Sequence, residues 1–262
     1  MKRTLIIATI ALVSLGLGYF IWTVKNAVDE KFAITDNLTS TPDSSSATIS
    51  KDTAETKAIA SAEQACSYEN VTSDLGIGIV IAPTTFEIFE DASLTKKRST
   101  IKMYEDEGKI NFCSMFFKPD YGIMHFACLE NGKNSYKVLT GFSDQKFLPK
   151  QKGYEFKTWE KYILESFGVR RKLEITPMQS LKESPNENSK DLEIPDGHEL
   201  FCPMALKGDW IQVKYDCFYN LESNEHEGEP CHNYIDKCDK PLTGWIKWKN
   251  KNDLLIDIFL MP

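Results

Sequence analysis

The most hydrophobic stretch of the chain lies near its amino terminus. Residues 4–23 run for twenty positions without a charged side chain, directly after Lys2 and Arg3. A helix of that length spans about 30 Å, the thickness of a bilayer's hydrocarbon core. Because positive charge precedes the segment, we predict a single-pass anchor in the inner (cytoplasmic) membrane, with the rest of the chain in the periplasm or outside. The alternative is a signal peptide cleaved near residues 14–16, which would leave a soluble periplasmic or secreted protein.

The following segment, residues 24–74, has a polar composition. Ten of the twenty-one residues from 37 to 57 are Ser or Thr, and none is aromatic. Such a sequence buries too little apolar surface to offset the entropy of ordering its backbone. We therefore expect residues 24–74 to form a flexible tether between the membrane segment, residues 1–23, and the folded part.

From residue 75 onward, short runs of β-branched and aromatic residues alternate with turn signals. This pattern predicts strands, which we place at 77–81, 86–89, 99–103, 110–117, 122–129 and 136–139. One helix is predicted over 158–167, where Trp159, Ile163 and Phe167 recur every four residues. Thr158 is suited to cap its first turn. We therefore expect residues 75–171 to form a β domain with one short helix.

The carboxyl-terminal part, residues 172–262, is also expected to be mainly β. Ile211, Val213 and Tyr215 alternate with more polar positions, as in a strand with one buried face. Further apolar runs lie at 200–202, 244–249 and 254–260. We assign this part of the chain to a second β domain.

The net charge of the chain comes largely from one segment. The chain has 31 Lys and Arg against 38 Asp and Glu, a net charge of −7. This balance argues against a general nucleic-acid binder, because nonspecific affinity for phosphate comes from clustered basic residues. Residues 216–239 carry seven of the acidic residues and a single lysine. We therefore expect a partner to bind at this segment.

Two motifs in the second domain resemble a known family. Residues 208–214 (GDWIQVK) and 243–248 (TGWIKW) resemble the W-x-V strand and the later G-W-[IV] strand of bacterial SH3-like domains. Residues 172–175 and 184–185 are similar to that family's opening strand and Pro-containing loop. The resemblance implies a small β-barrel that binds peptides, cell-wall fragments or other proteins and has no chemistry of its own.

The first domain resembles a diverged second copy. Residues 86–89 with 95–100 would supply the opening strand and loop, and 136–139 (YKVL) the W-x-V strand with Tyr in place of Trp. Residues 146–149 (KFLP) stand where Gly-Trp belongs, so this copy lacks that part of the motif. The fold class implied is mainly β: one or two small SH3-like β-barrels with a short helix, behind an N-terminal transmembrane helix and a flexible linker.

The second copy departs from the family by an insertion of 24 residues, 216–239. Loops longer than about 12–15 residues are more often functional than accidental. Its aromatic side chains either belong to the core or form an exposed recognition patch, since aromatics dominate interface hot spots. The residues predicted to bind a partner are Trp210, Phe218, Tyr219, Glu225, Glu227, Glu229, Tyr234 and Trp245.

All seven cysteines lie on the exported side of the predicted anchor, where an oxidising compartment favours disulfides. Cys113 and Cys128 flank a hairpin-like segment and could face each other across paired strands. Four further candidates form an even set that would clamp the insertion, with their pairing left open: Cys202, Cys217, Cys231 and Cys238. Cys66 is then left over near the tether.

A metal site is the alternative interpretation of the insertion. Its cysteines, with His226 and His232, are ligand types suited to zinc, but their spacing matches no zinc knuckle and oxidation would remove the thiolates. Its carboxylates contain no calcium-binding loop motif. We therefore predict no metal and no cofactor.

No catalytic motif is present in the sequence: it lacks G-x-S-x-G, H-E-x-x-H and a phosphate-binding loop. A Cys-His hydrolase needs a thiolate beside a histidine, and the candidate pairs are Cys128 with His125 and Cys231 with His232. We expect a non-catalytic binding protein of the bacterial envelope, such as an inhibitor or immunity protein with a basic protein partner. The alternatives are a peptidoglycan or cell-wall peptide binding module and a cysteine-dependent cell-wall hydrolase.

Overall fold

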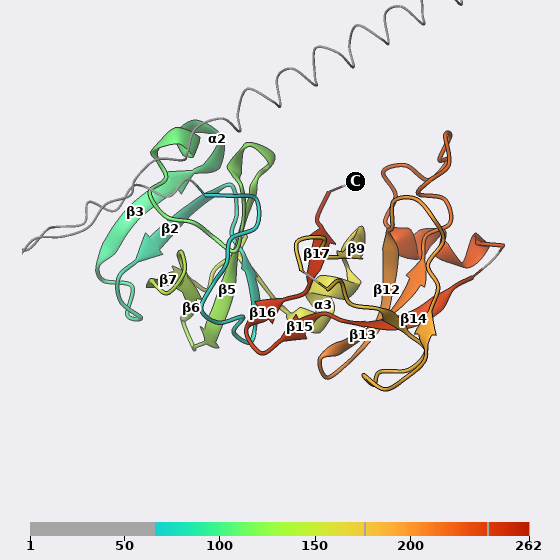
Figure 1. Ribbon diagram of the computed structural model, residues 1–262. Helices are drawn as coiled ribbons and strands as arrows, with labels where there is room; N and C mark the ends of the chain where they lie inside the picture. The colour runs from blue at the N-terminus through green and yellow to red at the C-terminus, as the bar shows by residue number, and fades with distance from the viewer. Residues whose placement is uncertain (1–65, 176, 240, 262) are drawn as a thin grey trace, which may run out of the picture. The chain divides into compact units, whose positions relative to one another are not determined.

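The computed structural model describes residues 66–175, 177–239 and 241–261 (Figure 1). The predicted membrane segment and most of the predicted tether lie outside these residues. Within the described residues, no helix is long and apolar enough to cross a membrane. This part of the chain is mainly β, as the sequence pattern predicts, and belongs to a single unit that contains two large antiparallel sheets.

The first sheet contains eight strands in the spatial order β3-β2-β7-β6-β5-β1-β8, with β4 beside β5. Its strands are β1 (Gly78–Ile81), β2 (Thr85–Phe89), β3 (Lys97–Lys102), β4 (Phe116–Lys118), β5 (Ile123–Asn131), β6 (Ser135–Leu139), β7 (Gln145–Pro149) and β8 (Glu155–Thr158). A short helix and two 3₁₀ turns connect β3 to β5: α2 (Met103–Asp106), η1 (Glu107–Lys109) and η2 (Pro119–Tyr121). The alternating apolar side chains of these strands enclose a core that includes Phe86, Phe126 and Leu148.

The second sheet contains seven strands in the order β11-β10-β14-β13-β12-β9-β17. Its strands are β9 (Gly168–Arg171), β10 (Leu181–Lys182), β11 (Asp191–Leu192), β12 (Phe201–Lys207), β13 (Trp210–Tyr215), β14 (Thr243–Lys247) and β17 (Ile256–Phe259). A two-stranded ribbon of β15 (Lys249–Asn250) and β16 (Asp253–Leu254) precedes β17. In β13, Ile211, Val213 and Tyr215 are buried, so the predicted alternation is confirmed.

The two sheets have the same topology. When β4 is left out, each sheet has seven strands. Numbered in chain order within their own sheet, these strands lie side by side in the order seventh, first, fourth, fifth, sixth, second, third in both sheets. The segment predicted over 136–139 is β6, which takes the same place as β13. The opening strands are β1 and β9, which precede the segments expected in that role, 86–89 and 172–175. Residues 86–89 instead begin the β2–β3 hairpin.

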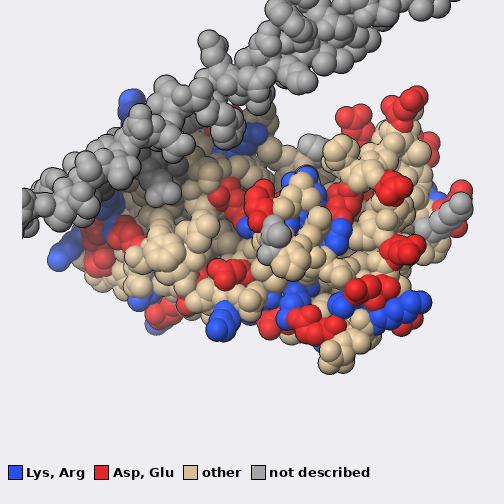
Figure 2. Space-filling view, in the orientation of Figure 1, with Lys and Arg blue, Asp and Glu red and all other residues tan. Residues whose placement is uncertain are grey.

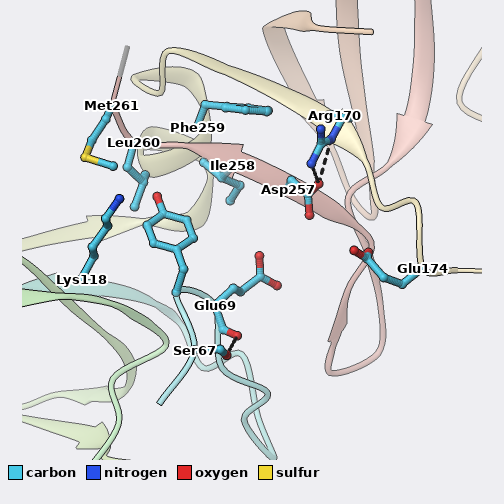
Figure 3. A pocket seen from close by; sticks show the side chains of 11 residues that line it. Ser67, Glu69, Lys118, Arg170, Glu174, Asp257, Ile258, Phe259, Leu260 and Met261 are labelled. Atoms are coloured by element: carbon cyan, nitrogen blue, oxygen red, sulfur yellow. Dashed lines mark hydrogen bonds and ion pairs between the residues drawn. The ribbon is translucent and has the colours of Figure 1, made fainter. Parts of the chain in front are cut away.

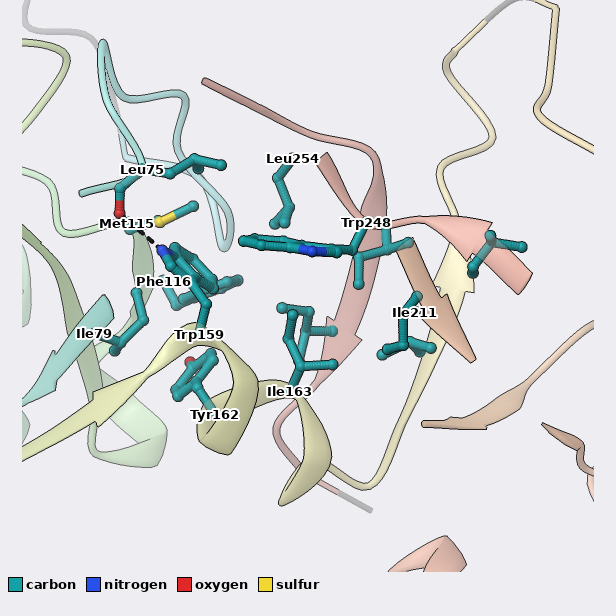
Figure 4. Packing of buried hydrophobic residues seen from close by; sticks show 14 of the residues in the cluster. Leu75, Ile79, Met115, Phe116, Trp159, Tyr162, Ile163, Ile211, Trp248 and Leu254 are labelled. Atoms are coloured by element: carbon teal, nitrogen blue, oxygen red, sulfur yellow. Dashed lines mark hydrogen bonds between the residues drawn. The ribbon is translucent and has the colours of Figure 1, made fainter. Parts of the chain in front are cut away.

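Helix α3 (Trp159–Leu164) lies between the two sheets in the chain and joins their cores. The Thr158 side chain caps it by accepting a hydrogen bond from the Lys161 N–H at 3.3 Å, as predicted. The helix ends at Leu164 and does not reach Phe167, whose N–H donates to the carbonyl of Phe259 in the second sheet. Figure 4 shows Trp159 packed among residues of both sheets, with its ring centroid 5.5 Å from that of Trp248.

Residues 66–74, assigned above to the tether, lie against the first sheet. The Phe117 N–H donates to the Tyr68 carbonyl at 2.7 Å, and the Asn70 N–H donates to the Met115 carbonyl at 2.8 Å. A disulfide between Cys66 and Cys113 fixes the start of the segment. These contacts explain why a segment with little apolar character is held in place.

Candidate functional site

The insertion, residues 216–239, is folded around two disulfides and is called the acidic loop below. Cys202 of β12 pairs with Cys231, and Cys217 pairs with Cys238, so the four cysteines predicted to clamp the loop do pair among themselves. Two 3₁₀ turns form its second half: η3 (Cys231–Asn233) and η4 (Ile235–Lys237). With the loop tied to β12, its conformation is largely set before any partner arrives.

The cysteine prediction for the first domain was wrong. Cys113 pairs with Cys66, which had been left over, and Cys128 is a free, buried thiol. Cys128 lies inside β5 and is flanked by Gly78 of β1 and Val138 of β6, whereas Cys113 lies in the loop before β4. Sequence separation suggested a hairpin pair, but the loop brings Cys113 to the amino-terminal segment.

Most aromatic side chains of the acidic loop form its core. Tyr234 is buried, and its hydroxyl donates to the buried carboxylate of Asp216 at 2.7 Å. Burial raises the pKa of the Tyr234 phenol, and Asp216 raises it further. The ring of His226 stacks on Tyr234 with 4.5 Å between centroids, and Phe218 packs edge-on against both. Tyr234 and Phe218 therefore fit the core interpretation and not the exposed patch.

Two apolar side chains of the acidic loop are exposed to solvent. Tyr219 is 40% exposed and Leu221 is 53% exposed. Tyr219 was predicted as a binding residue, whereas Leu221 had no sequence signal to single it out. They provide apolar contact area next to the charged side chains.

The acidic side chains of the loop are mostly exposed and uncompensated. Figure 2 shows acidic side chains gathered over the segment beyond β12 and β13. Glu225 has a side chain 77% exposed, and Glu222, Glu227 and Asp239 are also exposed. Among the described residues, the only lysine or arginine paired with an acid of this loop is Lys214, which binds Asp236. The loop therefore presents negative charge to solvent.

The Glu225 and Glu229 carboxylates flank the buried imidazole of His226. Glu225 lies 3.5 Å from Nε2 and Glu229 lies 3.8 Å from Nδ1. Both ring nitrogens lack a hydrogen-bond partner among the described residues. The two carboxylates lie beside different nitrogens of the same ring. The three side chains therefore do not point toward a common position between them.

Trp210 and Trp245 lie on the outer face of the second sheet. Both are half-buried, and the strand register places Trp245 opposite Gln212 and Trp210 opposite Lys247. The Lys247 ammonium lies 5.4 Å from the centroid of the Trp210 ring. Lys214, which binds the acidic loop, lies on the same face of β13. The predicted tryptophans and the acidic loop therefore share one side of the sheet.

Disulfides occupy the three cysteines of the insertion on which the metal and hydrolase alternatives drew. Cys217, Cys231 and Cys238 are all in disulfides, and in the described ranges no three His, Cys, Asp or Glu side chains are placed to hold a metal ion. Burial raises the pKa of the remaining thiol, Cys128, to about 12, so it does not supply a thiolate near neutral pH.

His125 does not form a reactive pair with Cys128. The two residues are three positions apart on β5, so their side chains point to opposite faces. His125 Nδ1 is instead hydrogen-bonded to the Tyr162 hydroxyl at 2.8 Å. Burial, together with the smaller effect of the nearby charge of Lys157, lowers the pKa of His125 to about 4. This is the satisfied core histidine that the apolar strand suggested.

A cavity that sequence reasoning missed lies beside β17. It has a volume of about 540 Å³ and is lined by Tyr68, Glu69, Lys118, Arg170, Glu174 and the end of β17 (Figure 3). Its walls come from four separate parts of the chain. No local motif could have indicated it, because only the tertiary fold brings these parts together.

No protein-family model, curated protein or solved structure matches this chain.

Proposed function

We propose that the chain is a non-catalytic binding protein of the bacterial envelope, which binds a basic surface of a partner protein through its acidic loop. The observation that carries the proposal is the group of exposed carboxylates on a loop held by two disulfides. Charge of one sign in an exposed, ordered loop speeds encounter with a surface of opposite sign. An inhibitor or immunity protein of an envelope-acting toxin would use such a surface.

We infer that both sheets are SH3-like barrels. The inference rests on the shared strand order and on the places of the W-x-V segment in β13 and the Gly-Trp segment in β14. Gly244 supports it physically, because a Cβ there would lie 2.6 Å from Cγ of Leu181. The Gly-Trp motif is thus the place where the β10 hairpin packs against β14.

The proposed location is the outer side of the inner membrane. The three disulfides support an oxidising compartment. The apolar segment 4–23 supplies the anchor in this proposal, and a cleaved signal peptide would give a soluble periplasmic or secreted form. In both forms the acidic loop faces partners outside the cytoplasm.

Charge reversal tests the proposed function. The triple variant Glu225→Lys, Glu227→Lys and Glu229→Lys changes exposed side chains and leaves the disulfides in place. We expect it to lose the partner recovered by crosslinked affinity purification from envelope fractions, and to weaken affinity for that partner about tenfold at low salt. The dependence of affinity on salt should become weaker as well.

A matched control carries the same change in net charge elsewhere. Glu130, Glu160 and Glu183 are exposed and lie outside the acidic loop. Their triple replacement by Lys should leave partner recovery unchanged. If the loop variant and the control recover the same proteins with the same salt dependence, the proposed function is incorrect.

The second candidate function is binding of a cell-wall peptide. It is favoured by Trp210 and Trp245, two half-buried tryptophans on one sheet face. Sedimentation with purified sacculi separates the candidates, because a protein inhibitor stays in the supernatant. If the wild type sediments and the double variant Trp210→Ala, Trp245→Ala does not, the cell-wall module is the better interpretation.

A further inference from the structure

A hollow smaller than the cavity beside β17 lies between the segment that follows β9 and the segment that precedes β12. It has a volume of about 280 Å³. Leu173 and Met178 line it from the first segment, and Ile194 and Pro195 line it from the second. Ile194 packs against the core, whereas Leu173 is 56% exposed and Met178 is 42% exposed. The apolar hollow, as we call it below, therefore presents two large apolar side chains to solvent.

A largely buried ion pair connects the two segments that form the apolar hollow. Arg171, at the end of β9, donates from Nε and Nη2 to the two carboxylate oxygens of Glu199 at 3.0 and 2.6 Å. Its Nη1 also donates to the carbonyl of Gln179, the residue after Met178. Arg171 thus binds both segments, and its charge is neutralised by Glu199. The hollow is therefore formed before a ligand arrives, which lowers the cost of binding.

The apolar hollow is joined to the acidic loop by the side chain of Asn220. Its Oδ1 accepts from the His198 N–H at 3.1 Å, and its Nδ2 donates to the His198 carbonyl at 2.6 Å. Gly197 has a φ of 111°, and a Cβ there would lie 3.2 Å from Cγ of Asn220, so the two segments are in close contact. Gly197 and His198 both line the hollow. The exposed Tyr219 and Leu221, which flank Asn220 in the chain, therefore lie near it.

The uncompensated charge around the apolar hollow is negative. Both arginines that line it are paired with a carboxylate. Asp196 lines the hollow and is exposed, and Glu174 and Glu193 are exposed and stand next in the chain to residues of its wall. Among the described residues, none of these three acids takes part in an ion pair. The hollow therefore complements a basic surface, as the acidic loop does.

We propose that the basic partner of the acidic loop inserts a phenylalanine side chain into the apolar hollow. This inference rests on the proposed function and extends its contact surface. A ring suits the site because a methionine thioether, here that of Met178, makes favourable contacts with aromatic rings. Aromatic side chains seated in pockets also dominate the binding energy of protein interfaces. The volume of about 280 Å³ lies just below the range of about 300–1,000 Å³ typical of small-molecule pockets, which suits a single side chain.

A second copy of the chain fits the apolar hollow less well than a basic partner does. The chain has a net charge of −7, and the charges that remain uncompensated around the hollow and on the acidic loop are negative. Two copies that met through this face would place like charges opposite one another, because a two-fold interface uses the same patch on both. A segment with Lys or Arg on both sides of a phenylalanine meets no such repulsion.

The test uses the full chain with ¹³C-labelled methionine methyl groups and the capped peptide Lys-Lys-Gly-Phe-Gly-Lys-Lys. We expect the phenylalanine ring to shift the methyl resonance of Met178, which the variant Met178→Leu identifies. The resonance of Met261, which lines the cavity beside β17, should stay in place. Two matched peptides carry Ala in place of Phe, or Glu in place of every Lys. Each should bind at least tenfold more weakly, since one lacks the anchor and the other has the wrong charge.

A substitution in the wall tests the site from the side of the protein. Leu173→Gln keeps the size of an exposed side chain and removes its apolar character. We expect it to bind the phenylalanine peptide about threefold more weakly, as for loss of part of an apolar contact. Ile77→Gln is the matched control, because Ile77 is 51% exposed and precedes the first strand of the other sheet. It should leave peptide affinity unchanged.

Three results would overturn the inference. They are a Met178 resonance that no peptide shifts, equal affinity for the Phe and Ala peptides, and a Met178 resonance that moves with protein concentration when no peptide is present. The last would show that a second copy covers the hollow. Failure of the proposed function is a different result, in which the triple charge reversal in the acidic loop retains the partner. Loss of the partner by that variant with no peptide response at Met178 would refute this inference alone.

Discussion

His125 is a polar residue whose role is set by its immediate neighbours. The Tyr162 hydroxyl satisfies Nδ1, and burial keeps the imidazole neutral by lowering its pKa to about 4. In the unfolded chain a histidine has a pKa of about 6.5. Between these two values the unfolded state binds a proton that the folded state does not. The stabilising contribution is therefore present above pH 6.5 and is lost as the pH falls toward 4.

Replacement of His125 should remove this part of the pH dependence. In the wild type, the free energy of unfolding should fall by up to about 3 kcal/mol between pH 6.5 and 4 because of this residue. His125→Gln keeps a polar group near Tyr162 and does not titrate. Urea denaturation at pH 7 and pH 5 with intact disulfides measures the difference. An equal loss of stability in both proteins would contradict the assigned role of His125.

At the residue scale, sequence reasoning succeeded where local surroundings decide the outcome. An apolar strand around His125 indicates a core position. It failed where a distant segment decides, as for Cys66, whose partner Cys113 lies 47 residues away. The aromatic residues of the acidic loop lie between these two cases. The exposure of Tyr219 and the burial of Tyr234 depend on how the loop folds onto its own disulfides.

Among the elements, the pairing of β14 with the β10 hairpin depends on one glycine. Lys182 of β10 pairs with Trp245, and Leu181 packs over Gly244. A Cβ at position 244 would lie 2.6 Å from Cγ of Leu181 and 3.0 Å from the Lys182 carbonyl oxygen. Since the backbone of β10 is part of this contact, a side-chain rotation alone does not relieve it.

Gly244→Ala should therefore destabilise the protein by about 1–3 kcal/mol, the usual cost of overpacking a core. Gly108→Ala is the matched control, because a Cβ at that position has no neighbour within 4 Å. Thermal or chemical denaturation of the two variants measures the difference. Equal stability of both variants would show that the β10 hairpin moves away at little cost.

The predicted strands and helix are present where a hydrophobic alternation or a capping residue marks them locally. The alternation at 210–215 and the Thr158 cap each identified an element that the structure contains. Residues 110–115, predicted as part of a strand, lie outside any strand because Cys113 is held by Cys66 and the backbone there bonds residues 67–70. β9, which starts at Gly168, lies before the expected start of the second domain at residue 172, because Phe167 and Gly168 are already bound to β17.

At the scale of the whole described chain, one hydrophobic cluster joins the two sheets. It contains Ile79 and Phe116 from the first sheet, Ile211 and Ile258 from the second, and Trp159 from α3. The indole N–H of Trp159 donates to the Leu75 carbonyl at 3.0 Å. Because this side chain contacts both halves, we expect the two sheets to unfold together.

Trp159→Ala should cost about 3–5 kcal/mol, as large deletions in a core usually do. Hydrogen exchange should show that amides of both sheets lose protection together. Trp210→Ala, which truncates a half-buried tryptophan of one sheet, is the control and should cost less. Loss of protection in only one sheet would show that the two halves are stable independently.

The sequence by itself determined the mainly β character, the capped helix, the disulfide clamp on the acidic loop and the position of the excess negative charge. These features follow from local periodicity, cap chemistry and composition, which need no distant partner. Only the tertiary structure decided the pairing of Cys66, the burial of Tyr234 and the cavity along β17. Each of these depends on contacts between segments far apart in the chain, and such contacts leave no local pattern in the sequence.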